Sequence, residues 1–197
     1  MTRGSVQWPG DDEPKPAPGP LVLVQALVNT VELADGSDRL ADPTVARPWL
    51  IENDLLAPQV ELTEADLDLV RGVREALRAL LVHNAGGPPP GDAALAALRA
   101  GAAGGAARAD FADDGQVRLT ADGDSVRDRL VVLLLIIRDA QRDGSWARLK
   151  ACANDECRWA FYDRSRNRGG AWCEMAACGN KLKNREFRAR RRKVGAP

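Results

Sequence analysis

The segments CANDEC (residues 152–157) and CEMAAC (residues 173–178) contain all four cysteines of the 197-residue chain. Four residues separate the cysteines within each pair, and fifteen residues separate the two pairs. Two close pairs joined by a medium-length loop can direct four thiolates at one point, as a tetrahedral structural zinc site requires. The predicted ligands of a structural Zn²⁺ ion are Cys152, Cys157, Cys173 and Cys178.

Other interpretations of the four cysteines are weaker. Four unrelated buried thiols would not be expected to fall into two matched pairs, and a catalytic zinc site keeps one position open and rarely uses four cysteines. A redox switch in which oxidation expels the metal stays open. The module has few large apolar side chains, so zinc is expected to contribute on the order of 10 kcal/mol to its folding.

The residues around the cysteines predict a small finger similar to treble-clef fingers. Two short strands are expected over Arg158–Tyr162 and Ala171–Cys173, with a turn at residues 166–170 between them. A helix is expected from about Lys181 to Arg192, with Cys178 at its start.

The residues before the finger have mainly helical patterns. The clearest helix begins at Thr63, where Asp66 completes a capping box, and its apolar residues recur at helical spacing up to Leu81. Residues 21–31 form an apolar segment for which a helix is favoured over a strand. Shorter helices are expected from Pro43 and over residues 93–100.

Two further elements complete the N-terminal part. A hairpin over residues 108–120 would turn at Asp113-Asp114-Gly115. A helix capped at Asp124 or Ser125 is expected to run to about Gln141, and its apolar middle, residues 130–137, predicts a place at the centre of a bundle. A buried strand is the alternative for this middle segment.

Together these patterns predict a mainly α protein with a helical N-terminal domain and a small zinc finger. The predicted divisions are a disordered leader over residues 1–20, rich in Pro and Gly, a helical domain over 21–143, and a finger with a basic tail over 144–197.

The zero net charge of the chain hides a strong asymmetry. Residues 142–197 hold 15 Lys and Arg against 6 Asp and Glu, whereas the rest of the chain holds 13 against 22. Clustered cations neutralise phosphates and release counterions, so we predict that the finger binds a nucleic acid, with DNA favoured over RNA. The predicted contact residues are Arg164, Arg166, Arg168, Lys181, Lys183, Arg185, Arg188, Arg190, Arg191 and Arg192.

Two alternatives to nucleic-acid binding stay open at this point. The charges could form a solvated helix face, or the basic finger could bind an acidic protein, which would make the chain an interaction adaptor. The aromatic side chains among the charges could stack on bases. For Phe161 and Trp172, however, a place in the small core of the finger is preferred.

The stretch from Arg148 to Arg192 resembles the CGNR zinc finger. The matching residues are Cys152, Cys157, Phe161, Asp163, Ser165, Arg166, Asn167, Trp172, Cys173, Met175, Cys178, Gly179, Asn180 and Lys183. Members of that family join the finger to a helical domain called ABATE and are described as stress-induced transcription regulators. Residues 27–30, 49–50 and 74–78 are similar to that domain. The resemblance implies a DNA-binding regulator, although Lys181 stands where the family has arginine, and a bidentate guanidinium is lost there.

The sequence favours a regulator over an enzyme. The single histidine, His83, is expected to end a helix, and no nucleophile elbow, phosphate-binding glycine loop or two-histidine motif is present. An enzyme with a structural finger remains a third interpretation. Should the helical domain sense a small-molecule effector, its pocket would be formed by Asn29, Thr30, Arg74 and Arg78. The alternative is that the first two cap helices and the arginines lie on the surface.

Segments for membranes or export are not apparent. The longest apolar run has eight residues, against the roughly 20 that a spanning helix needs. An acidic, proline-rich start lacks the pattern of a secretory signal, and four clustered thiols suit a reducing compartment. A cytoplasmic bacterial protein is therefore expected, and self-association as a homodimer stays open.

Overall fold

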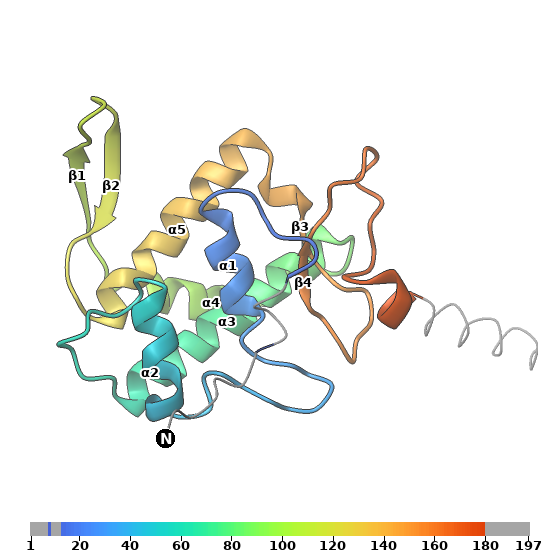
Figure 1. Cartoon of the computed structure of the whole chain (residues 1–197), viewed down its shortest axis with the longest axis horizontal. Helices are drawn as coiled ribbons and strands as arrows, with labels where there is room; N and C mark the ends of the chain where they lie inside the picture. The colour runs from blue at the N-terminus through green and yellow to red at the C-terminus, as the bar shows by residue number, and fades with distance from the viewer. Residues whose placement is uncertain (1–7, 9–12, 180–197) are drawn as a thin grey trace, which may run out of the picture.

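The computed structural model of the chain describes residue 8 and residues 13–179. The elements of the N-terminal part are α1 (Leu21–Val28), α2 (Pro43–Glu52), α3 (Glu64–Asn84), α4 (Asp92–Ala102), β1 (Ala107–Phe111), β2 (Val117–Ala121) and α5 (Val126–Asp143). The finger contains a 3-10 turn η2 (Trp146–Arg148), β3 (Leu149–Ala151), β4 (Ala160–Tyr162) and a π-helical turn η3 (Met175–Gly179). The helical part and the finger lie side by side (Figure 1).

The long helix α3 organises the core, and its predicted start is confirmed. The Thr63 hydroxyl accepts a hydrogen bond from the Asp66 amide at 3.2 Å, and the Asp66 carboxylate accepts one from the Thr63 amide at 3.3 Å. One face of α3 is apolar at helical spacing and packs against α1, α4, α5 and β3. The core that results is continuous from the helices into the finger, because Leu149 and Tyr162 belong to the same apolar cluster.

The segment from Leu21 is a helix, as favoured by its sequence, although it ends at Val28. Residues 13–20 were expected in a disordered leader, yet they pack against this helix and the finger. The Ala17 side chain is buried, and its backbone amide donates to Gln25 Oε1 at 2.6 Å. Lys15 Nζ donates to the Trp172 carbonyl at 2.6 Å. Hydrogen bonds to buried partners thus order a segment whose composition suggested disorder.

Helix α5 also begins where predicted, with Ser125 and Asp128 forming a second capping box. It ends at Gly144, whose φ of 79° is the left-handed conformation that favours glycine at a helix end. The alternative of a strand is wrong. The central position is also wrong, since only the stripe that includes Leu130, Leu133 and Ile137 is buried and the rest of residues 131–136 is half-exposed. Among the described residues, the helices that pack on α5 leave its other side incompletely covered.

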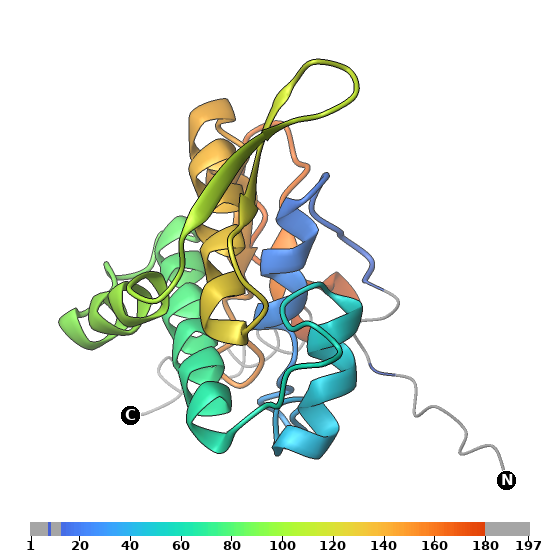
Figure 2. The ribbon, with the colours of Figure 1, turned by 90° about the vertical axis from the view of Figure 1, so that its left-hand side faces the viewer.

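The predicted hairpin is confirmed as β1 and β2, which pair antiparallel with Ala107 opposite Ala121 and Phe111 opposite Val117. Gly115, in the turn, has a φ of 77°, which explains the Asp-Asp-Gly sequence. The hairpin lies at the end of the molecule opposite the finger, with β2 beside α5 and the turn projecting beyond the helices (Figures 1 and 2). None of the helices among the described residues has both the length and the apolar character to cross a membrane.

Candidate metal centre and the arginine loop

The first cysteine pair lies in the turn of a short hairpin. Strands β3 and β4 pair antiparallel with Ala151 opposite Ala160, and the Cys152 amide donates to the Trp159 carbonyl at 2.9 Å. Arg158, with a φ of 50°, completes the tight turn after Cys157. The pairing corrects one prediction. The strand expected over residues 158–162 is present as β4, but its partner is residues 149–151, before the cysteines, and residues 171–173 form no strand.

The second pair is held beside the first by backbone contacts. The Ala153 amide donates to the Ala171 carbonyl at 2.9 Å, which joins the two halves of the finger just before Cys173. The Cys178 amide donates to the Glu174 carbonyl at 3.1 Å within η3. Each half thus delivers two thiols to one place.

The four sulfur atoms fit a tetrahedral metal. All four lie within 4.8 Å of one another. A Zn–S distance of about 2.3 Å separates tetrahedral sulfur ligands by about 3.8 Å. The Sγ atoms of Cys157 and Cys173 are 3.7 Å apart, and those of Cys173 and Cys178 are 3.8 Å apart. The predicted structural zinc site is confirmed by this donor set, in which all four ligands are sulfur and no position is left for a reacting water.

The ionisation of the thiols supports the same conclusion. Hydrogen bonds from Cys157 and Cys173 lower the pKa of Cys152 to about 2. The bond to Cys152 raises the pKa of Cys157 to about 12, and it also raises the pKa of Cys173. Negative charge on one sulfur therefore suppresses ionisation of its neighbours, because like charges this close repel. A divalent cation removes the conflict and lets all four bind as thiolates.

Aromatic side chains surround the cysteines as a small core. Phe161 is fully buried among the sulfurs, and Trp159 and Trp172 pack against them while partly buried. Trp159 Nε1 donates to the Glu13 carboxylate at 2.7 Å, which ties the ordered N-terminal segment to the finger. The preferred place of Phe161 and Trp172 in the finger core is confirmed.

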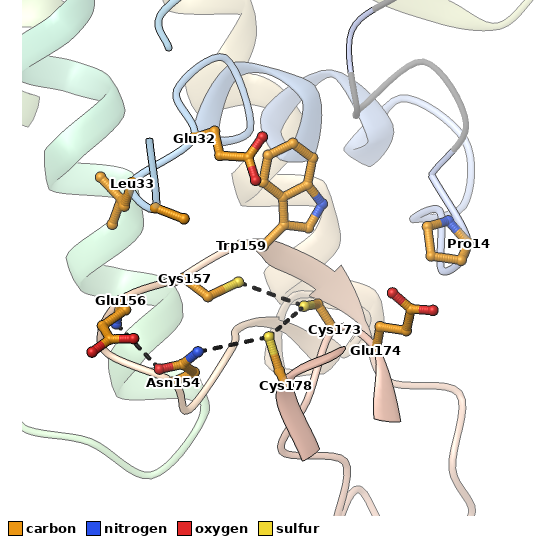
Figure 3. Close-up of a pocket in the computed structure, with 11 residues that line it drawn as sticks. Pro14, Glu32, Leu33, Asn154, Glu156, Cys157, Trp159, Cys173, Glu174 and Cys178 are labelled. Carbon is orange, nitrogen blue, oxygen red and sulfur yellow. Dashed lines mark hydrogen bonds between the residues drawn. The ribbon is translucent and has the colours of Figure 1, made fainter. Parts of the chain in front are cut away.

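A cavity of about 540 Å³ opens beside the cysteines. Figure 3 shows the sulfurs of Cys157, Cys173 and Cys178 between Trp159 and Asn154. The side-chain amide of Asn154 lies 3.8 Å from Cys178 Sγ. Glu32, Glu156 and Glu174 also line the cavity. Three carboxylates lie beside a zinc site whose four thiolate charges exceed the two charges of the ion, and both repel phosphate, so this side of the described finger does not suit a nucleic acid.

Two of the four proposed effector residues, Asn29 and Arg78, lie at the seam between the helices and the finger, whereas Thr30 and Arg74 contact the helical part. Asn29, Thr30, Arg74 and Arg78 are all buried, so the alternative that the arginines lie on the surface is wrong. Asn29 Oδ1 accepts from the Ala160 amide at 2.7 Å, and Asn29 Nδ2 donates to the Ala160 carbonyl at 2.9 Å. The side chain therefore pairs with β4 as a neighbouring strand would.

The two arginines make similar internal contacts. Arg78 donates to the Val28 carbonyl at 2.7 Å and to the Arg158 carbonyl at 3.0 Å. Arg74 pairs with Asp38 at 2.7 Å and donates to Thr30 Oγ1 at 3.2 Å. Of the four residues, Asn29 also lines a cavity of about 210 Å³. Their polar groups are thus engaged within the fold.

Sequence analysis missed Gln25, which is also buried at the seam. Its Nε2 donates to the Ala160 carbonyl at 3.1 Å. A single glutamine within the otherwise apolar run of α1 was the signal that could have found it, because a buried amide needs partners.

Replacing Asn29 by alanine is expected to lower the free energy of unfolding by about 1–3 kcal/mol, since the buried Ala160 amide loses its acceptor. The Ala160 carbonyl keeps Gln25 as donor, so the loss is limited to one orphaned group. Denaturant unfolding at fixed zinc measures it, and amide hydrogen exchange at Ala160 should accelerate. Asn53→Ala, which removes a half-buried bond within α2, is the matched control. Equal effects of the two variants would contradict this account of the seam.

The loop between the two cysteine pairs, residues 163–170, presents three predicted contact residues and is called here the arginine loop. Arg164, Arg166 and Arg168 are exposed on it. Arg164 Nη2 donates to the Pro16 carbonyl at 2.9 Å and the guanidinium lies 5.6 Å from the Tyr162 ring centre. No ion pair joins any of the three to another residue within 13–179.

A buried ion pair that sequence analysis did not predict anchors this loop. Lys150 Nζ lies 2.9 Å from Asp163 Oδ2, and the side chains are 7% and 3% exposed. The Asp163 carboxylate also accepts from the amides of Ser165 at 3.0 Å and Gly170 at 2.8 Å. Burial acts to raise the pKa of Asp163, but these hydrogen bonds, with Lys150 foremost, hold it well below its usual range. The Asp163 carboxylate therefore holds the two ends of the loop together.

Other predicted residues lie elsewhere. His83 is exposed near the end of α3, with Nδ1 3.2 Å from the Gly87 carbonyl. The remaining predicted contact residues, Lys181, Lys183, Arg185, Arg188, Arg190, Arg191 and Arg192, and the predicted helix over 181–192, lie outside the described residues.

Comparison with known protein families matches both parts of the chain. A family model described as "CGNR zinc finger" matches residues 148–191. A second model, ABATE, described as "Putative stress-induced transcription regulator", matches residues 21–142. None of the curated proteins compared with the chain matches it.

Proposed function

The chain belongs to the ABATE family and carries a CGNR zinc finger, and from this premise we propose that it is a cytoplasmic, zinc-dependent transcription regulator that binds DNA through its finger. In this proposal the zinc ion maintains the fold of the finger and takes no part in a reaction. Both families are named for regulation or metal binding and neither for catalysis, which supports a binding function.

The observation that carries the proposal is the arginine loop. Three exposed arginines lie within eight residues whose backbone is tied to the Lys150–Asp163 pair. A preorganised loop loses little conformational entropy when it meets a phosphate backbone, and guanidinium groups bind phosphate through two parallel hydrogen bonds. The acidic cavity lies on another part of the finger, so the loop is the side of the described finger that suits a polyanion.

The helical domain is proposed to act as the sensing or interaction module. It contacts the finger directly, through Asn29 at β4 and through Arg78 at the Arg158 carbonyl. An effector that shifts α1 or α3 would change these contacts, and a change in the position of the finger would follow. The seam is thus the route by which the two parts would be coupled.

Zinc-loaded full-length protein is expected to bind random duplex DNA with an affinity that falls steeply between about 50 and 200 mM salt, because binding releases counterions. Fluorescence anisotropy of a labelled duplex measures this affinity, and chelation of zinc should abolish it. Arg166→Gln and Arg168→Gln should each weaken binding to all sequences and reduce the slope of log affinity against log salt by about 1.

Arg99→Gln is the matched control, since it removes one exposed positive charge from α4, outside the finger. It should leave the slope unchanged. Absence of binding at low salt, with zinc confirmed in the protein, would reject the proposal and favour the adaptor alternative, in which the same arginines bind an acidic protein.

A further inference from the structure

The β1–β2 hairpin has one apolar and one polar face, and both are exposed. Residues that share the first face are Ala107, Ala109, Phe111, Val117, Leu119 and Ala121. Phe111 is 74% exposed and Val117 is 61% exposed. The second face consists of Arg108, Asp110, Arg118 and Thr120. A two-stranded hairpin alone is marginally stable in water, and an apolar face of this kind usually marks a contact surface.

The outer edge of β1 offers backbone groups that do not pair with β2. The Asp122 amide donates to the Ala106 carbonyl at 2.8 Å, and the Ala112 amide donates to the Gln116 carbonyl at 2.9 Å. Hydrogen-bonded pairs alternate along an antiparallel ladder, so Arg108 and Asp110 use their backbone groups toward β2. The amides and carbonyls of Ala107, Ala109 and Phe111 therefore point away from β2, along an edge that can accept another strand. In the single chain the Phe111 amide donates to Asp110 Oδ1 at 2.8 Å, and a partner strand would take over this bond and release the carboxylate.

We propose that a second copy of this chain pairs its β1 with this edge, antiparallel and symmetric about Ala109, so that the two hairpins form one four-stranded sheet. A two-fold axis at Ala109 matches the outward groups of both copies, because Ala109 meets Ala109 of the partner subunit and Phe111 meets Ala107 of the partner subunit. Apolar side chains then continue across one face of the whole sheet, and all residues of β1 are paired.

The charged side chains favour this register over those reached by sliding one β1 strand along the other. With the axis at Ala109, Arg108 lies opposite Asp110 of the partner subunit, and the same pair forms a second time by symmetry. These are non-hydrogen-bonded pairs, whose side chains approach most closely. Sliding the partner strand by two residues in one direction places Arg108 opposite Arg108 of the partner subunit. Sliding it by two residues in the other direction places Asp110 opposite Asp110 of the partner subunit. A slide of one residue sets apolar side chains against polar ones.

The other edge of the hairpin is turned toward its own subunit, because β2 contacts α5. A groove of about 750 Å³ lies between β2 and α5 and is lined by Leu119, Leu135 and Ile136. The edge of β1 is therefore the one left for a partner strand. One two-fold axis thus satisfies the open edge and the charges and sets Phe111 beside Ala107 of the partner subunit, which favours a second copy over an unrelated partner.

A charge-exchange experiment on the full-length protein tests the proposal. Sedimentation equilibrium should show a dimer for the natural sequence. Arg108→Asp and Asp110→Arg each turn the two attractive pairs into repulsive ones, and each should raise the dimer dissociation constant about tenfold or more. Mixing the two single variants should restore the dimer as a heterodimer, because the copy with two acids then faces the copy with two arginines. The double exchange Arg108→Asp/Asp110→Arg should dimerise by itself.

The mixing step separates loss of the interface from damage to the hairpin, since a misfolded hairpin would not be rescued by its complement. Arg99→Asp on α4, which reverses an exposed charge outside the hairpin and its groove, is the control and should leave the dissociation constant unchanged. A monomeric natural sequence would overturn the proposal. So would a dimer that survives both single variants, or single variants that fail to associate when mixed.

Discussion

Replacing Cys173 by serine is expected to release the zinc ion and to unfold the finger. The serine hydroxyl is a poor ligand at neutral pH, and the remaining three sulfurs cannot complete a tetrahedral site. Structural zinc contributes on the order of 10 kcal/mol to the folding of such modules, far more than any other single interaction described above. The apolar core around Phe161 is too small to compensate, because it consists mainly of the cysteines and two partly buried tryptophans.

The effect is expected to extend beyond the finger. Leu149, Ala151, Ala160 and Tyr162 contribute to the same apolar cluster as the helices. Loss of β3 and β4 therefore exposes part of α3 and leaves the buried Asn29 amide without its partner. We expect the Cys173→Ser variant to lose stability in the helical part as well, seen as a lower melting temperature in far-ultraviolet circular dichroism.

Zinc content by elemental analysis and tryptophan fluorescence measure the finger directly. Glu174→Gln, at the next position along the chain and exposed, is the matched control and should keep one zinc ion per chain. Lowering the pH should release zinc from the natural protein too, since the thiolates must then take up protons. A Cys173→Ser variant that retains a full complement of zinc and an unchanged melting temperature would refute the tetrahedral site.

The features that could be predicted from the sequence are those with local signals. The capping box at Thr63, the helix start at Asp124 or Ser125, the Asp-Asp-Gly turn and the paired cysteines each depend on a few neighbouring residues, and each is found where predicted. Such signals need no knowledge of distant partners, because capping and turn geometry are decided within one turn of the chain.

The features that could not be predicted depend on contacts between distant segments. Strand β3 has only three residues, and its place is set by pairing with β4 and by packing on α3, so no periodicity marks it. The burial of Arg74 and Arg78 follows from carbonyl and carboxylate partners that arrive from elsewhere in the chain. An arginine in a sequence is ordinarily expected on the surface, and only its partners in the folded chain account for its burial.

Replacing Asp163 by asparagine is expected to lower the free energy of unfolding by about 3–5 kcal/mol, because it leaves the Lys150 ammonium buried without its counterion. The lowered pKa of Asp163 determines how the contribution of this carboxylate to stability changes with pH. A carboxyl group whose pKa is lower in the folded state stabilises the fold above its unfolded pKa of about 3.9, and that contribution disappears as the pH falls below it. The natural protein should therefore lose more stability than Asp163→Asn as the pH is lowered through this range.

A double-mutant cycle isolates the ion pair from the other bonds of the carboxylate. Lys150→Met combined with Asp163→Asn leaves no unpaired buried charge, so the double variant should be less destabilised than the sum of the two single variants. Asp139→Asn, which removes one partner of an exposed pair on α5, is the control and should change stability by at most about 1 kcal/mol. The same Asp163→Asn protein should retain zinc but bind DNA more weakly, because the arginine loop loses the carboxylate on which it closes. An additive cycle, or DNA affinity unchanged in Asp163→Asn, would show that the buried pair neither stabilises the finger nor preorganises the loop.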